Sequence, residues 1–61
     1  MAKSMKGMKK IQDARISSGG RMFEVWADAD HTLWTYYPQL KKIQRGTDSG
    51  DGPLEDATDI P

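Results

Sequence analysis

The sequence predicts a mainly β protein, a small α+β unit built on a three-stranded antiparallel meander. All five aromatic residues lie within residues 21–38, in two runs of strand-forming residues separated by the turn residues DADH. A second turn cluster, SSGG, precedes the first of these runs. Length is the third observation, because a chain of 61 residues has room for one domain at most.

The expected strands are KIQDARIS at 10–17, RMFEVWA at 21–27 and TLWTYY at 32–37. If both loops act as even-length hairpins, Phe23 lies between Ala14 and Tyr36. Val25 then lies opposite Trp34. The core face in this register holds Ala14, Ile16, Phe23, Val25, Ala27, Trp34 and Tyr36. The other face holds Ile11, Asp13, Arg15, Met22, Glu24, Trp26, Leu33, Thr35 and Tyr37.

A short helix is expected after the third strand, in PQLKKIQR. Pro38 is tolerated in the first turn of a helix, and Leu40 and Ile43 are three residues apart on one side. Gly46 would end this helix.

The N-terminal segment allows two interpretations. Met5, Met8 and Ile11 recur at a spacing of three, which favours a helix that SSGG would end. Gly7 weakens that interpretation, so the sequence leaves residues 3–16 open between strand and helix.

The composition of the two ends divides the chain into a flexible basic arm at 1–9, a small β-sheet domain at 10–45 and an acidic flexible tail at 46–61. Lys and Arg counted against Asp and Glu give +5 for residues 1–21, −3 for 22–37, +3 for 38–46 and −5 for 47–61. Ends that are charged and poor in aromatic residues are typical of solvated segments. We therefore expect the tail to contribute little to folding.

No enzymatic chemistry is expected. The chain has no cysteine, which excludes thiolate zinc sites and cysteine nucleophiles. His31 falls in a turn beside Asp28 and Asp30, where it is interpreted as a loop residue, and DADH lacks the further oxygen ligands of a calcium loop. SSGG is interpreted as a hairpin turn only. The prediction is therefore no catalytic residue, no metal and no cofactor.

No secretory signal or membrane span is visible, so a cytoplasmic location, or one within a virus particle, is expected. Small independent reading frames of this kind are common in phage genomes, which favours a virion component or a host-directed inhibitor.

A protein partner is the main functional prediction. One short helix covers only one face of a three-stranded sheet, and contiguous exposed apolar patches usually mark interfaces. The sequence therefore predicts a non-enzymatic interaction or structural accessory protein, working as a homo-oligomer or within a larger assembly. The expected contact residues are Met22, Trp26, Leu33 and Tyr37.

Single-stranded nucleic acid is the alternative partner, because aromatic residues on a sheet stack bases and nearby cations hold phosphates. The residues for this role are Lys3, Lys6, Lys9, Lys10, Arg15, Arg21, Trp26 and Tyr37. The closing DATDIP resembles the acidic tip of bacterial single-stranded-DNA-binding proteins, which implies recruitment of partner proteins. The terminal phenylalanine of that tip is missing here.

Overall fold

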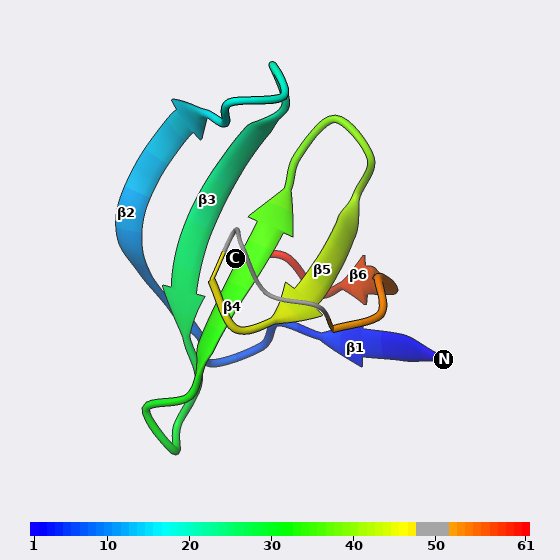
Figure 1. The fold of residues 1–61 in the computed structure, drawn as a ribbon. Coiled ribbons are helices and arrows are strands. Elements are labelled where there is room, and N and C mark those ends of the chain that lie inside the picture. The colour runs from blue at the N-terminus through cyan, green and yellow to red at the C-terminus, as the bar shows by residue number, and fades with distance from the viewer. Residues whose placement is uncertain (48–51) are drawn as a thin grey trace.

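The computed structural model describes residues 1–47 and 52–61, and within them the chain forms a single sheet and no helix. Its strands are β1 (Ala2–Ser4), β2 (Lys9–Ile16), β3 (Met22–Ala27), β4 (Leu33–Tyr37), β5 (Lys42–Arg45) and β6 (Glu55–Thr58). The order across the sheet is β1-β6-β5-β4-β3-β2 (Figure 1). The predicted mainly β class is confirmed.

The predicted meander corresponds to β2, β3 and β4, whose ends agree with the expected strands to within one residue. It continues antiparallel through β5 to β6, and β1 completes the sheet by pairing in parallel with β6. The predicted three strands are therefore half of a larger sheet.

The helix predicted after Pro38 is wrong. Residues 38–41 form a turn, in which the N–H groups of Leu40 and Lys41 both donate to the Tyr37 carbonyl at 3.1 and 2.8 Å. Lys41 takes a positive φ of 52°, which stops a right-handed helix from continuing. Ile43 is fully buried from β5 instead, so burial in the sheet outweighs the local helical pattern.

Residues of the arm and of the tail join the sheet, which therefore extends beyond the predicted three strands. β1 lies within residues 1–9, and β6 lies within residues 46–61 between β1 and β5. Side chains join these ends as well, since Lys42 pairs with Asp56 and the Ser4 hydroxyl donates to Asp59 at 2.7 Å. The first contact holds the tail to β5, and the second holds it to β1.

The predicted register is wrong by one residue between β3 and β4. Trp26 lies opposite Trp34, and Glu24 lies opposite Tyr36. Five residues, 28–32, separate the last paired residues Ala27 and Leu33, so the loop is odd in length. Because successive side chains alternate between faces, the shift of one residue moves Trp26 to the same face as Trp34 and Tyr36.

The first strand pair departs from the predicted register too. Arg15 lies opposite Phe23, where Ala14 was expected, and residues 17–21 form another odd loop. Two register shifts, between Lys10 and Gln12 and between Gln12 and Arg15, are β-bulges in β2. No single register therefore describes this pair.

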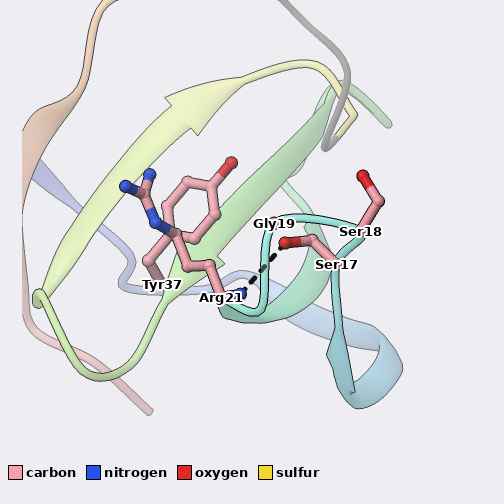
Figure 2. Close-up of a pocket in the computed structure, with 5 residues that line it drawn as sticks. All are labelled: Ser17, Ser18, Gly19, Arg21 and Tyr37. Carbon is pink, nitrogen blue, oxygen red and sulfur yellow. Dashed lines mark hydrogen bonds between the residues drawn. The ribbon is translucent and has the colours of Figure 1, made fainter.

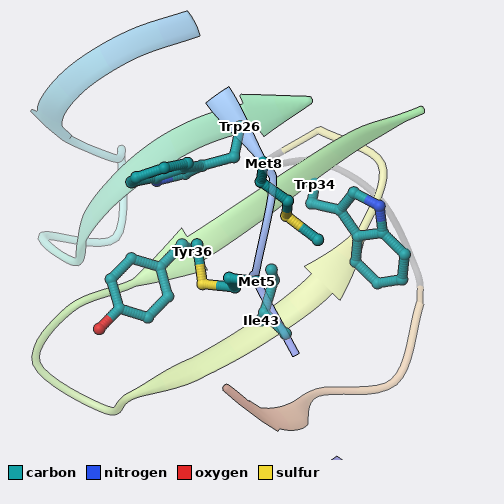
Figure 3. Close-up of a cluster of buried hydrophobic side chains, with 6 residues drawn as sticks. All are labelled: Met5, Met8, Trp26, Trp34, Tyr36 and Ile43. Atoms are coloured by element: carbon teal, nitrogen blue, oxygen red, sulfur yellow. The ribbon is translucent and has the colours of Figure 1, made fainter. Parts of the chain in front are cut away.

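The core lies on the face that carries Trp26. Met5, Met8, Trp26, Trp34, Tyr36 and Ile43 form one buried cluster (Figure 3). Met5 and Met8 flank a tight turn at residues 6–7, where Gly7 has a φ of +82° and the Met8 N–H donates to the Met5 carbonyl at 3.0 Å. Their spacing of three therefore belongs to a turn between two strands, which resolves the strand-or-helix question for this segment.

The second face of the sheet is covered in its centre. Thr35 is fully buried and Tyr37 is 3% exposed. The Thr35 hydroxyl donates to the Gly46 carbonyl at 2.8 Å, which satisfies a polar group that would be costly to bury alone.

The radius of gyration is 10.3 Å, close to the roughly 10.5 Å expected of a folded domain of this length.

Candidate functional site: the exposed edge strand β2

Strand β2 is the least covered part of the sheet. It lies at the end of the strand order, and within the described residues only β3 pairs with it (Figure 1). Seven of its eight residues are exposed, and Gln12 alone is partly buried. An exposed edge strand offers unpaired backbone groups and side chains to another molecule.

Two isoleucines stand out on this strand. The exposed fractions of Ile11 and Ile16 are 61% and 64%, the largest of any big apolar side chain in β1 to β6. The exposure of Ile16 was not predicted, because the even register placed it on the core face, whereas Ile11 was placed on the opposite face. The two bulges are the physical reason, since they turn the strand and re-aim its side chains.

Positive charge surrounds these isoleucines. Lys9, Lys10 and Arg15 lie on β2 against a single acid, Asp13. Lys10 is partly neutralised, because its Nζ lies 3.6 Å from the Glu24 carboxylate. Lys6 and Arg21, in the turns on either side of β2, are exposed and add to the same edge.

A pocket of about 360 Å³ opens beside Ile11. Lys9 and Ile11 of β2 line one side of it, and the β3–β4 loop supplies the other. The full lining is Gly7, Lys9, Ile11, Ala27, Asp28, Ala29 and His31. This lining combines small apolar groups with Lys9, His31 and the Asp28 carboxylate, and it suits an apolar side chain.

Asp28, at the rim of this pocket, has a structural role. Its carboxylate accepts hydrogen bonds from the Trp34 indole at 2.9 Å and from the N–H groups of Asp30 and Thr32 at 2.9 and 3.0 Å. The bond from Trp34 is the main reason that the pKa of Asp28 lies below its ordinary value, against a smaller opposing effect of burial. A carboxylate held ionised in this way is a poor proton donor at neutral pH.

Three cations lie over aromatic rings. Lys3 Nζ lies 4.8 Å from the centre of the Trp34 ring, and Lys10 Nζ lies 5.6 Å from that of Trp26. The Arg21 guanidinium lies 5.2 Å from the centre of the Tyr37 ring. Lys10 and Arg21 therefore cover the two rings, Trp26 and Tyr37, that the nucleic-acid alternative would need for stacking.

The four residues predicted to contact a partner are not gathered on one exposed patch. Trp26 and Tyr37 are buried, at 5% and 3% exposure, and Met22 is half-buried. Leu33 is exposed at 39%. The premise that Trp26 and Tyr37 lie in water is wrong, because the odd loop turns Trp26 inward and the second face is covered. A contact role for these residues stays a prediction.

The residues predicted for nucleic acid are only partly brought together. Lys6, Lys9, Lys10, Arg15 and Arg21 lie on β2 or in its flanking turns. Lys3 lies on β1, at the far end of the strand order. Trp26 and Tyr37 are buried, so their rings are not open to a base in this structure.

Other chemistry is sparse in residues 1–47 and 52–61. No group of three or more His, Asp or Glu side chains there is placed to hold a metal ion. None of the described residues belongs to a helix long and apolar enough to cross a membrane. Comparison with known proteins finds no matching family model, no significant match among curated proteins and none among solved structures.

Proposed function

We propose that this protein is a non-enzymatic binding module whose strand β2 contacts an acidic segment of a protein partner. The observation that carries the proposal is the exposure of Ile11 and Ile16 on a cationic edge strand. Burying such a side chain contributes about 1.5–3 kcal/mol, so the two isoleucines of β2 supply a useful part of a modest interface.

The partner's acidity follows from charge complementarity. β2 and its flanking turns, residues 5–21, carry five cations against Asp13 alone. Like charges across an interface are costly, so a basic partner is disfavoured. The acidic tail of a second copy is a poor occupant, because Asp56 and Asp59 already bind Lys42 and Ser4 within the chain.

Side-chain contact is the expected mode, in preference to a long backbone ladder. Bulges blunt the edge strands of natural sheets against continuous pairing. β2 has two bulges within eight residues, so a partner meets short stretches of regular strand. Specificity then comes from the isoleucines, the neighbouring cations and the pocket beside Ile11.

Protein is favoured over single-stranded nucleic acid by the state of the aromatic rings. Stacking contributes about 1–3 kcal/mol per base, but it needs an open ring face. Trp26, Trp34 and Tyr37 are buried and carry Lys10, Lys3 and Arg21 over their rings.

The test uses the full chain and the peptide EDIEGEDIEG, which carries acids and two isoleucines. Two matched peptides, EDSEGEDSEG and KKIKGKKIKG, remove the apolar and the acidic feature in turn. We expect binding of the first peptide only, with amide shifts on β2 in heteronuclear NMR spectra. Equal binding of the basic peptide, or shifts confined to other strands, would contradict the proposal.

Variants locate the contact. Ile11→Ser and Ile16→Ser should each weaken binding of the acidic peptide by about tenfold, given the value of a buried isoleucine. Leu40→Ser is the control, because Leu40 is 45% exposed and lies in the β4–β5 turn. A labelled oligothymidylate of twenty residues tests the nucleic-acid alternative. Tight binding whose affinity falls steeply with salt concentration would favour nucleic acid.

A further inference from the structure

A second pocket lies at the tip of the β2–β3 hairpin, away from the isoleucine pocket. It has a volume of about 280 Å³ and is lined by Ser17, Ser18, Gly19, Arg21 and Tyr37 (Figure 2). Ligand pockets usually begin near about 300 Å³, so this one suits a single small group. Among the described residues its lining contains a cation, two serine hydroxyls and a tyrosine, and no carboxylate.

Arg21 is the charged group of this pocket. Its side chain is exposed, and no described residue forms an ion pair with it. The guanidinium lies 5.2 Å from the centre of the Tyr37 ring. Contact with a buried ring limits the conformations of the arginine, which lowers the entropy lost when it binds an anion.

The hairpin loop supplies further donors. The N–H groups of Ser17, Gly20 and Arg21 are engaged, with the Arg21 carbonyl, the Ser17 carbonyl and the Ser17 hydroxyl respectively. Within the part of the chain that the structure describes, the N–H groups of Ser18 and Gly19 have no hydrogen-bond partner. The Ser17 hydroxyl accepts from Arg21 and keeps its own proton to donate.

We propose that this pocket binds a phosphate monoester group. A guanidinium supplies two parallel donors to a phosphate, and hydroxyl and backbone donors at another angle suit the remaining oxygens of a tetrahedral anion better than those of a planar carboxylate. Figure 2 shows the Arg21 side chain alongside the Tyr37 ring, with Ser17 and Ser18 on the other side of the ring.

The phosphate is carried by a protein side chain, as in phosphoserine. This step rests on the proposed function, since the hairpin tip directly follows β2 and a partner bound along β2 can reach it. A nucleotide is disfavoured, because Arg21 already occupies the Tyr37 ring and Trp26 and Trp34 are buried.

The test is a set of NMR titrations of the full chain at constant ionic strength. The probes are inorganic phosphate, N-acetyl-O-phosphoserine amide and adenosine monophosphate, with chloride as the blank. We expect saturable shifts of the Ser18, Gly19 and Arg21 amides with the first two probes, and weaker binding of adenosine monophosphate. Absence of saturable shifts with phosphate would overturn the site, and tighter binding of the nucleotide would overturn the protein source.

Variants separate a built site from general positive charge. Arg21→Gln should reduce phosphate affinity by about tenfold or more, because it removes a charge-assisted bidentate contact. The phosphate affinity of Arg21→Lys should lie between those of the natural chain and Arg21→Gln, since lysine keeps the charge but cannot form the bidentate contact. Arg15→Gln is the matched control on the same hairpin and should leave the affinity unchanged. An equal loss in Arg15→Gln and Arg21→Gln would overturn the proposal.

Failure here can be told apart from failure of the proposed function. The acidic-peptide test depends on Ile11 and Ile16, whereas phosphate binding depends on Arg21 and the loop donors. Binding of inorganic phosphate without binding of the acidic peptide would support the anion pocket and contradict the proposed protein partner.

Discussion

The two hairpins of the meander have nearly the same backbone and very different side-chain chemistry. In each, five residues separate the last paired residues of two strands, at 17–21 and at 28–32. The first N–H of each loop donates to the last carbonyl, at 2.8 Å in one and 3.0 Å in the other. The fourth residue has a positive φ in both, 82° at Gly20 and 63° at His31.

The difference lies in what stabilises this shared geometry. In the 17–21 loop, glycine takes the left-handed position and Ser17 makes one side-chain hydrogen bond. In the 28–32 loop, a histidine takes that position, and Asp28 binds two loop N–H groups and the Trp34 indole. One loop is fastened to the core through Trp34, whereas the other leaves donors and Arg21 exposed. The same turn can therefore serve folding in one place and binding in another.

Removing a residue from each loop should separate these roles most strongly. Deletion of His31 removes the residue in the left-handed position, and a loop that keeps five residues by taking in Leu33 sets Trp26 opposite Thr35. Trp26 and Trp34 then lie on opposite faces, which is incompatible with the buried cluster. Turning a buried tryptophan outward costs roughly 3 kcal/mol or more, a large share of the stability of a small domain. We expect the variant to lose cooperative unfolding. Tryptophan fluorescence measured during urea denaturation tests this.

Deletion of Gly20 is the matched change in the other hairpin. It shifts the register of β2, whose side chains are mostly exposed, so less burial is lost. We expect a folded protein with a lower urea midpoint. Equal damage from the two deletions would show that the hairpins do not differ in their connection to the core.

Substitution of the loop acceptors is the next largest change. Asp28→Asn weakens three hydrogen bonds, one of them to a buried tryptophan, whereas Ser17→Ala removes one exposed bond. We expect the thermal unfolding midpoint to fall clearly further for Asp28→Asn, as measured by circular dichroism. A larger effect of Ser17→Ala would reverse the comparison.

Acid should weaken the 28–32 hairpin selectively. The pKa of Asp28 in the folded protein lies below its ordinary value of 3.8, chiefly because of the bond from Trp34. Its contribution to stability is therefore complete above pH 3.8 and is lost as the pH falls through the lowered folded pKa. The stability difference between the natural chain and Asp28→Asn should shrink below that pH. A difference that is constant from pH 6 to pH 2 would contradict the role given to Asp28.

These hairpins also show which features of the fold the sequence predicts. Strand-forming residues on either side of SSGG and of DADH locate β2, β3 and β4 to within one residue, because turn and strand preferences are local. The odd length of the 28–32 loop depends on a residue in the left-handed conformation at the fourth position. Histidine at that position does not by itself predict this conformation. One misjudged residue then reversed the face of Trp26 and, with it, the predicted contact patch.

The remaining differences are not local. β6 joins the sheet by pairing with β5, and β1 pairs with β6 between residues more than fifty positions apart. The sequences of both strands have the composition of solvated ends. The bulges in the strand that exposes Ile11 and Ile16 cannot be predicted from the residues KKIQDARI. The Arg21 pocket needs Tyr37 beneath the guanidinium, and that contact depends on the sheet bringing β4 near the β2–β3 loop.

The smallest expected effect comes from exchanging residue types at the left-handed position. A non-glycine residue there costs roughly 1–2 kcal/mol, reduced for histidine, which adopts this conformation more readily than most. His31→Gly should therefore raise the free energy of unfolding by about 0.5 kcal/mol, after the greater entropy of an unfolded glycine is subtracted. Gly20→Ala should lower it by about 1 kcal/mol through backbone strain alone, because no atom lies within 4 Å of the added Cβ. Urea denaturation at neutral pH measures both changes. If His31→Gly is destabilising instead, the imidazole contributes a contact of its own at the pocket beside Ile11, and the two hairpins differ at the fourth residue as well as at the first.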